Sequence, residues 1–134
     1  MIQKLPLLLL LPCLVHAQTT LIPDARFERA LIDLGIDTDQ TINGQMATQD
    51  AWAVTSLEIS TSSLPNYPYT TSSADYYDGL IHDLTGLEAF VNVEQLTVSF
   101  TMAEQINLSG LVHLKHLIFG DNMLTSVDVS HNPL

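Results

Sequence analysis

The sequence predicts a β-rich solenoid in which short parallel strands stack in coils of about 21 residues, preceded by a small α-helical cap. The first observation is a recurring pair of apolar residues that flank a single residue. The first members of these pairs, Leu96, Ile106, Leu117 and Val127, lie about 10 or 11 residues apart. The second observation is that alternate pairs share one period, about 21 residues. A fixed period of this length is typical of stacked structural repeats.

Residues 1–17 are predicted to be a secretory signal peptide. Lys4 precedes an apolar run, and the triplet Val15-His16-Ala17 places small side chains at the positions that a signal peptidase reads. Cleavage after this triplet would remove Cys13, the only cysteine, so the mature chain would contain neither a disulfide nor a thiolate ligand. The alternative is a lipoprotein anchored through Cys13, although Pro12 fits that motif poorly.

The charge balance argues against one class of partner. The chain has 4 basic and 15 acidic residues, and loss of Lys4 with the signal peptide leaves 3 against 15. Such a surface repels phosphate backbones and anionic lipids, so no nucleic-acid partner is expected. No membrane span is expected either, because the apolar run at residues 5–15 is too short to cross a bilayer.

Residues 18–53 are predicted to form the N-terminal cap. Pro23 suits a first helical position, Asp24 complements the helix N-terminus, and Gly35 indicates where the helix ends. Asn43-Gly44 is a tight-turn signal and is expected to join two short strands. The apolar residues at the i, i+3, i+4, i+7 spacing of one helix face are Phe27, Ala30, Leu31 and Leu34.

Residues 54–134 are predicted to form the repeats. In each pair the two apolar side chains point the same way, because strand side chains alternate with period two. Stacking the coils buries this inward row and pairs the strands in parallel. Since the pairs alternate at two spacings, each coil is expected to contain two strands, one on each side of a flattened solenoid. The residues assigned to the repeat are Leu57, Ile59, Leu96, Val98, Ile106, Leu108, Leu114, Leu117, Phe119, Asn122, Leu124, Val127, Val129 and Asn132.

The two asparagines of this set have a separate role. An amide at Asn122 or Asn132 can satisfy backbone groups where the chain turns away from a strand. Ser62, Thr101 and Leu111 stand at the equivalent position of other coils, so the earlier coils are expected to be less regular.

Residues 61–79 are predicted to form an insertion loop, because the segment is rich in Ser, Thr, Pro and Tyr and has no helical period. Exposed loop tyrosines supply contact area at a low entropic cost and suit a binding surface. The alternative is that they pack the loop against the body. The tyrosines of this loop are Tyr67, Tyr69, Tyr76 and Tyr77.

One segment has the beginning of a calcium-binding pattern. Asp37 and Asp39 alternate as ligands do in a calcium loop. However, Ile42 stands at the position that requires glycine, and Thr48 stands at the position of the bidentate glutamate. An acidic turn is the favoured interpretation, so no metal ion and no other cofactor is expected.

Catalytic motifs are not found in the sequence. It contains no glycine-rich phosphate loop and no GxSxG motif, and its Ser, His and Asp residues follow no catalytic spacing. His113 and His116 are expected to be exposed side chains rather than a metal pair. The chain is therefore predicted not to be an enzyme.

The sequence resembles the bacterial secreted leucine-rich-repeat proteins of internalin-like type. Residues 114–134 read LxxLxLxxNxL in two overlapping frames, while "IPDARFERALIDLGIDTDQTINGQ", "VTSLEIS" and "DLTGLEAF" resemble the cap and first coils of that family. The resemblance implies a leucine-rich-repeat solenoid on a secreted or surface-displayed protein that binds macromolecules without catalysis. Related repeats often carry cysteine where this chain has Val98 and Phe119, so no cysteine ladder is expected.

The predicted function is binding of a protein or glycan partner, outside the cell or at its surface. The outward positions Thr97, Ser99, Ile118 and Gly120, beside the tyrosine loop, are the candidate contacts. The alternatives are a structural capping or spacer segment of a longer surface protein, or an accessory domain of a secreted enzyme. Because the pattern stops at Leu134 without a polar closing element, the chain is expected to be incomplete at its C-terminus.

Overall fold

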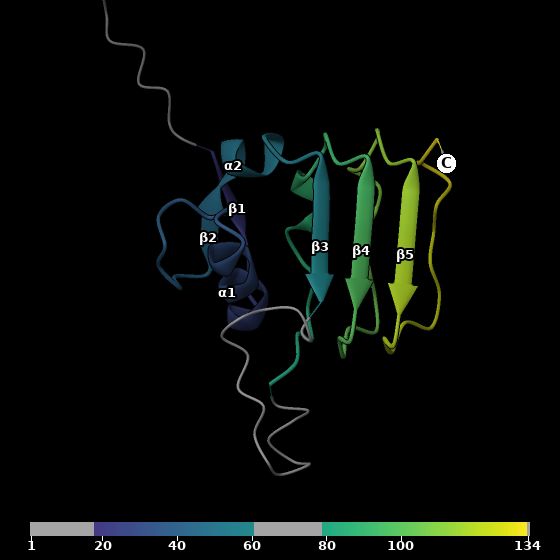
Figure 1. Cartoon of the computed structure of the whole chain (residues 1–134), viewed down its shortest axis with the longest axis horizontal. Helices are drawn as coiled ribbons and strands as arrows, with labels where there is room; N and C mark the ends of the chain where they lie inside the picture. The colour runs from purple at the N-terminus through teal and green to yellow at the C-terminus, as the bar shows by residue number, and fades with distance from the viewer. Residues whose placement is uncertain (1–17, 61–78, 134) are drawn as a thin grey trace, which may run out of the picture.

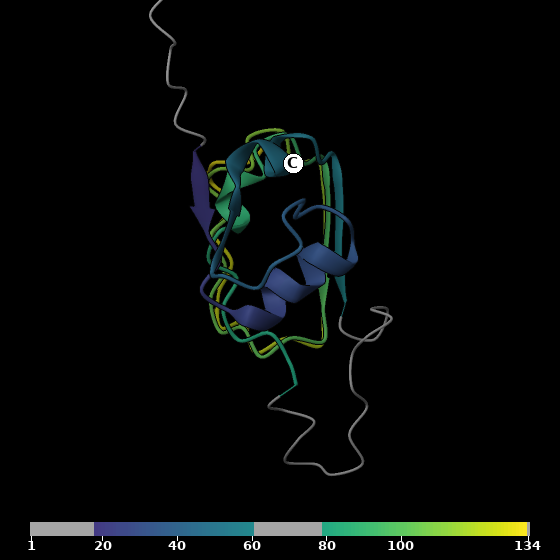
Figure 2. The same cartoon turned by 90° about the vertical axis from the view of Figure 1, so that its left-hand side faces the viewer.

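The computed structural model describes residues 18–60 and 79–133. The predicted signal peptide, the four tyrosines and nearly all of the predicted insertion loop lie outside the described residues. Within them, three parallel strands stand side by side, and a smaller sheet with two helices closes one end of the stack (Figure 1). Seen along the stack, the coils superimpose as one closed outline, with helix α1 lying across its end (Figure 2).

Helix α1, Ala25–Asp33, forms the base of the cap. The predicted buried face is confirmed for Phe27, Ala30 and Leu31, which are fully buried. Leu34 is also predicted on this face but is 42% exposed, because it is the C-cap residue and lies beyond the last helical turn. Gly35 follows with φ +70°, the left-handed conformation that commonly ends a helix.

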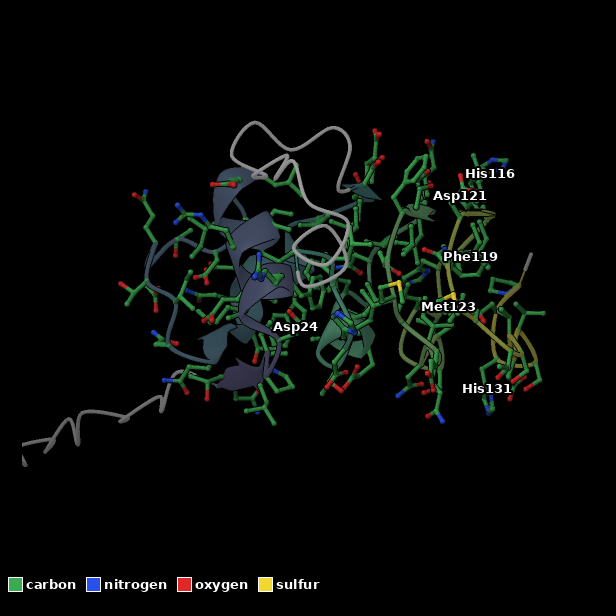
Figure 3. All side chains as sticks on the ribbon, turned by 90° about the horizontal axis from the view of Figure 1, so that it is seen from below. Asp24, His116, Phe119, Asp121, Met123 and His131 are labelled. Carbon is green, nitrogen blue, oxygen red and sulfur yellow. The ribbon has the colours of Figure 1, made fainter. Side chains whose placement is uncertain are left out.

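Asp24 begins this helix and also connects it to the first coil. One carboxylate oxygen accepts hydrogen bonds from the N–H groups of Arg26 and Phe27, which makes Asp24 the N-cap residue. Pro23 therefore precedes the cap, and the prediction that it is the first helical residue is wrong. The other oxygen accepts the N–H groups of His82 and Asp83 at 2.7 and 3.0 Å, so Asp24 links segments 58 residues apart (Figure 3).

The cap sheet pairs β1, Thr19–Leu21, with β2, Gln45–Ala47, in antiparallel register. Asn43-Gly44 directly precedes β2, but the expectation of a tight hairpin is wrong, because α1 and its following loop separate the two strands. The turn is instead held by Glu28, a buried residue of α1. Its carboxylate accepts the N–H groups of residues 43, 44 and 45 at 2.9 to 3.1 Å.

The main sheet consists of β3, Ser56–Ser60, β4, Gln95–Ser99, and β5, His116–Gly120, in that order. Leu96 pairs with Leu117, which confirms the predicted repeat spacing for these two strands. The spacing between β3 and β4 is longer, since Leu57 pairs with Leu96. Residues 61–78, between these two strands, lie outside the described residues, so the insertion loop stays a prediction.

The opposite side of each coil differs from the prediction. The pairs that begin at Ile106 and Val127 are not strands, and this wall consists of turns and the short 3₁₀ helix η1, Leu87–Ala89. The reason is local hydrogen bonding by the polar residue that opens each turn. The side chains of Asp83, Asn107 and Asp128 each accept the N–H group of the residue two positions later, which favours a turn over a strand.

The core lies between the sheet and this wall of turns. Leu57, Ile59, Leu96 and Val98 are at most 2% exposed and form the inward rows of β3 and β4, as predicted. Leu108 and Leu114 are equally buried, so they face the core although they are not in strands. Val127 and Val129 are predicted in the core but are 39% and 38% exposed, because no described coil covers them.

Close stacking of the turns requires glycine at two positions. A Cβ atom at Gly86 would lie 2.6 Å from the carbonyl oxygen of Leu21, and one at Gly110 would overlap the carbonyl oxygen of Glu88. At Gly110 the obstacle is backbone of the preceding layer, which cannot rotate away, whereas at Gly86 the Cβ would meet Cδ1 of Ile22 as well as this backbone oxygen. The two glycines therefore set the distance between successive layers on this wall.

Asn122 has the role predicted for it at the end of β5. Its Nδ2 donates to the carbonyl oxygen of Val98 at 2.8 Å, and its Oδ1 accepts both the N–H and the hydroxyl of the buried Thr101. Asn132 acts similarly one half-coil later, donating to the carbonyl oxygens of Leu108 and Leu111. Each amide thus connects its own coil to the preceding one.

Candidate binding face

The outward side of the main sheet brings the predicted contact residues together. We define the outward face as the nine positions that alternate with the core row on β3, β4 and β5, eight of which carry a side chain. By the strand register, Thr97 lies beside Ile118, and Ser99 lies beside Gly120. The outward face comprises Ser56, Glu58, Ser60, Gln95, Thr97, Ser99, His116, Ile118 and Gly120.

The central row of this face changes character across the sheet. It runs from the carboxylate of Glu58 through the hydroxyl of Thr97 to the aliphatic side chain of Ile118. Ile118 is 60% exposed, although it stands in the middle of its strand. An exposed aliphatic side chain among polar neighbours can anchor a partner, because its desolvation on contact is favourable.

The outward face ends on β5 with Gly120, a position without a side chain. A Cβ atom at Gly120 would lie 3.5 Å from Oγ of Ser99, which is an ordinary van der Waals contact. The glycine is therefore not required by its neighbour on β4, and its lack of a side chain leaves the Ser99 hydroxyl uncovered.

Five residues of the outward face are absent from the predicted contacts. Ser56, Glu58, Gln95 and His116 are exposed, whereas Ser60, at the end of β3, is only 5% exposed and contributes little surface. The signal for them is present in the sequence, because Leu57 and Ile59 are assigned to the core and the residues between and beside them must face outward.

An ion pair stands where β5 begins. Nζ of Lys115 lies 2.9 Å from the carboxylate of Glu94, and both side chains are about half exposed. The hydrogen bond from Lys115, followed by its positive charge, lowers the pKa of the Glu94 carboxyl below its ordinary value. His113 and His116 are exposed, as predicted, and their charge lowers this pKa slightly further.

The acidic loop of the cap forms a hydrogen-bonded turn. Asp39 accepts the N–H of Thr41 at 2.7 Å and the side-chain amide of Asn43 at 2.9 Å. Asp37 is buried, and burial, followed by the negative charge of Asp39, raises its pKa above the ordinary value. Among residues 18–60 and 79–133, no three His, Cys, Asp or Glu side chains are grouped so that they could hold a metal ion. The calcium hypothesis for Asp37 and Asp39 stays a prediction.

Two adjoining hollows lie on the wall of turns, away from the outward face. The sequence pattern predicts no site there. The larger has a volume of about 430 Å³ and the smaller about 210 Å³, and both are lined mainly by polar side chains. Asp83, Thr85 and Gln105 line both hollows. Glu88 and Asn107 line only the smaller one, and Glu104 lines only the larger one.

Comparison with known proteins gives one structural likeness. Neither a protein-family model nor a curated protein matches the sequence. A solved structure described as the functional domain of InlJ from Listeria monocytogenes, which includes a cysteine ladder, is similar with a TM-score of 0.43 and 19% sequence identity. The match covers 88% of this chain and 27% of that chain. None of the helices in the described part of this chain is long and apolar enough to cross a membrane.

Proposed function

We propose that this chain is a leucine-rich-repeat module, secreted or displayed at the cell surface, that binds another protein and has no catalytic activity of its own. The observation that supports this most is the outward face, on which three strands in register present nine positions in a fixed array. The core row and the Asn122 hydrogen bonds hold this array, so the outward positions are free to serve recognition.

A protein partner fits this face better than a glycan. Ile118 supplies an apolar centre, whereas the nine face positions carry no Phe, Tyr or Trp against which a sugar could stack, and their one ring is the imidazole of His116. Glu58 and His116 add charged or ionisable groups toward opposite edges of the sheet, as polar rims do around protein interfaces. The tyrosines of the 61–79 segment stay predicted contributors beside this face.

The test is a binding screen with the labelled chain against an array of extracellular protein domains and, separately, a glycan array. We expect a protein hit that Thr97→Lys abolishes, because the new side chain stands in the centre of the face. The matched control is Val112→Lys, which introduces the same residue at an exposed position away from the face. Binding that survives Thr97→Lys, or that appears only on the glycan array, would contradict the proposal.

A structural role as a capping or spacer segment is the second candidate. One observation favours it, namely that β5 is the outermost strand of the described sheet and leaves its far edge open to further pairing. A folded chain with no hit on either array would support this role. An accessory role beside a catalytic domain predicts the same binding on the two arrays as a binding module does. The two roles differ only in the protein to which the chain is attached.

A further inference from the structure

The open edge of β5 has backbone groups available for pairing. The carbonyl oxygen of Gly120 accepts the N–H of Phe100, and the N–H of His116 donates to the carbonyl oxygen of Glu94, so these groups face β4. Backbone groups alternate in direction along a strand. The N–H and C=O groups of Leu117 and Phe119 therefore point away from β4, along the edge that no described strand covers.

The side chains at this end of the stack are also incompletely covered. Leu117 and Phe119 continue the core row but are only half-buried, whereas Leu96 and Val98 at the same positions of β4 are 1% and 0% exposed. A hollow of about 230 Å³ opens beside them and is lined partly by Phe119, Leu124 and Val127. Figure 3 shows Phe119 and Met123 together at this end. A strand edge next to an apolar surface is a template for another strand.

We propose that the occupant of this edge is a second copy of the chain, paired antiparallel through β5 about a twofold axis at Ile118. In this register Ile118 faces Ile118 of the second copy, and Leu117 faces Phe119 of the second copy. The outward-pointing backbone groups of Leu117 and Phe119 then form the hydrogen-bonded pairs. Ile118 falls at the non-hydrogen-bonded pair, where opposing side chains approach most closely.

Charge complementarity selects this occupant and this register. Lys115 is the only lysine or arginine after Arg29. Extended by one residue beyond each end of β5, the same antiparallel register brings Lys115 of each copy toward Asp121 of the other, whereas a parallel copy in register would bring Lys115 toward Lys115. The Lys115 side chain is 57% exposed and its Nζ lies 2.9 Å from Glu94, so the proposed pair requires this side chain to turn from Glu94 toward Asp121 of the second copy. The pairing requires no ligand and is independent of the proposed binding function.

The experiment measures the mass of the full chain, expressed with its N-terminal segment and purified as the host processes it. Light scattering and sedimentation velocity over a range of concentrations are expected to show a dimer. Lys115→Asp places aspartate opposite Asp121, and Asp121→Lys places lysine opposite Lys115, so each variant alone is expected to be monomeric. An equimolar mixture is expected to form a heterodimer, because both cross-strand pairs are then of opposite charge.

Two further variants separate the edge from the rest of the sheet. Ile118→Lys places two lysines at the twofold axis and is expected to give a monomer, whereas Thr97→Lys on the inner strand β4 is expected to leave the dimer intact. Asp121 has φ +51°, a conformation that strains lysine, so Asp121→Lys could lose the dimer through strain at that position. A comparison at Lys115 avoids this problem, because Lys115→Met is expected to keep the dimer while Lys115→Asp loses it. A monomeric parent chain, dimeric charge variants, or folded variants that fail to form the mixed dimer would each overturn the proposal.

Discussion

Replacing Asn122 by alanine is expected to destabilise the stack strongly, because the side chain connects two coils through three hydrogen bonds. The change removes the acceptor of the Thr101 N–H and hydroxyl and the donor to the Val98 carbonyl. Thr101 is 1% exposed, so water does not readily replace the lost partner of its N–H. A buried polar group left unpaired costs about 1–3 kcal/mol, and two backbone groups are affected, so we expect a loss of about 2–6 kcal/mol.

Urea unfolding followed by circular dichroism measures this loss. With a slope of about 2 kcal/mol per molar urea, in the middle of the range for a small domain, the midpoint should fall by about 1–3 M. Asn107→Ala is the matched control, because Asn107 is exposed and its carboxamide only accepts hydrogen bonds from Ser109 within its own turn. That variant should lose about 0.5 kcal/mol or less. Equal losses for the two variants would refute the role assigned to Asn122.

Three further predictions concern the stacking of the turns, the acidic loop and the N-terminus. Gly110→Ala should lower the free energy of unfolding by about 1–3 kcal/mol because its Cβ meets backbone of the preceding layer, whereas Gly120→Ala, with room for a Cβ, should leave the thermal midpoint nearly unchanged. The raised pKa of Asp37 means that the fold binds more protons than the unfolded chain above the ordinary pKa of 3.8. This contribution to stability is lost as the pH rises through the folded pKa, so Asp37→Asn should stabilise the protein at neutral pH but not near pH 3, as measured by urea unfolding. Intact mass of the secreted chain should show cleavage after Ala17, and a lipid adduct on Cys13 would contradict this.

The strands of the main sheet could be predicted from the sequence because their signal is local. The alternation of Leu96 with Val98 recurs one coil later in Leu117 with Phe119, and this recurrence is sufficient to define both the inward row and the parallel register. The same alternation placed Thr97 and Ile118 on the outward face. It also identified the helix face of Phe27, because burial follows the helical period there.

The wall of turns could not be read from the same pattern. Asn107 and Asp128 occupy the middle of aliphatic pairs and look like outward strand residues, but their side chains accept hydrogen bonds from their own backbone two residues later. Such local bonds compete with strand formation, and a hydrophobic pattern does not report them. The role of Glu28 was equally hidden, because its partners at residues 43–45 are distant in sequence.

The most direct test of the stacked fold is nuclear magnetic resonance spectroscopy of the isotope-labelled chain, with cross-strand NOEs as the readout. We expect amide-to-α-proton contacts that connect Gln95–Ser99 with His116–Gly120 in parallel, with Leu96 beside Leu117. Contacts between Ser56–Ser60 and Gln95–Ser99 should place Leu57 beside Leu96. Together they would establish the register that creates both the outward face and the open edge of β5. Intramolecular antiparallel contacts between these strands, or a register shifted by one position, would turn the core row outward and contradict the fold.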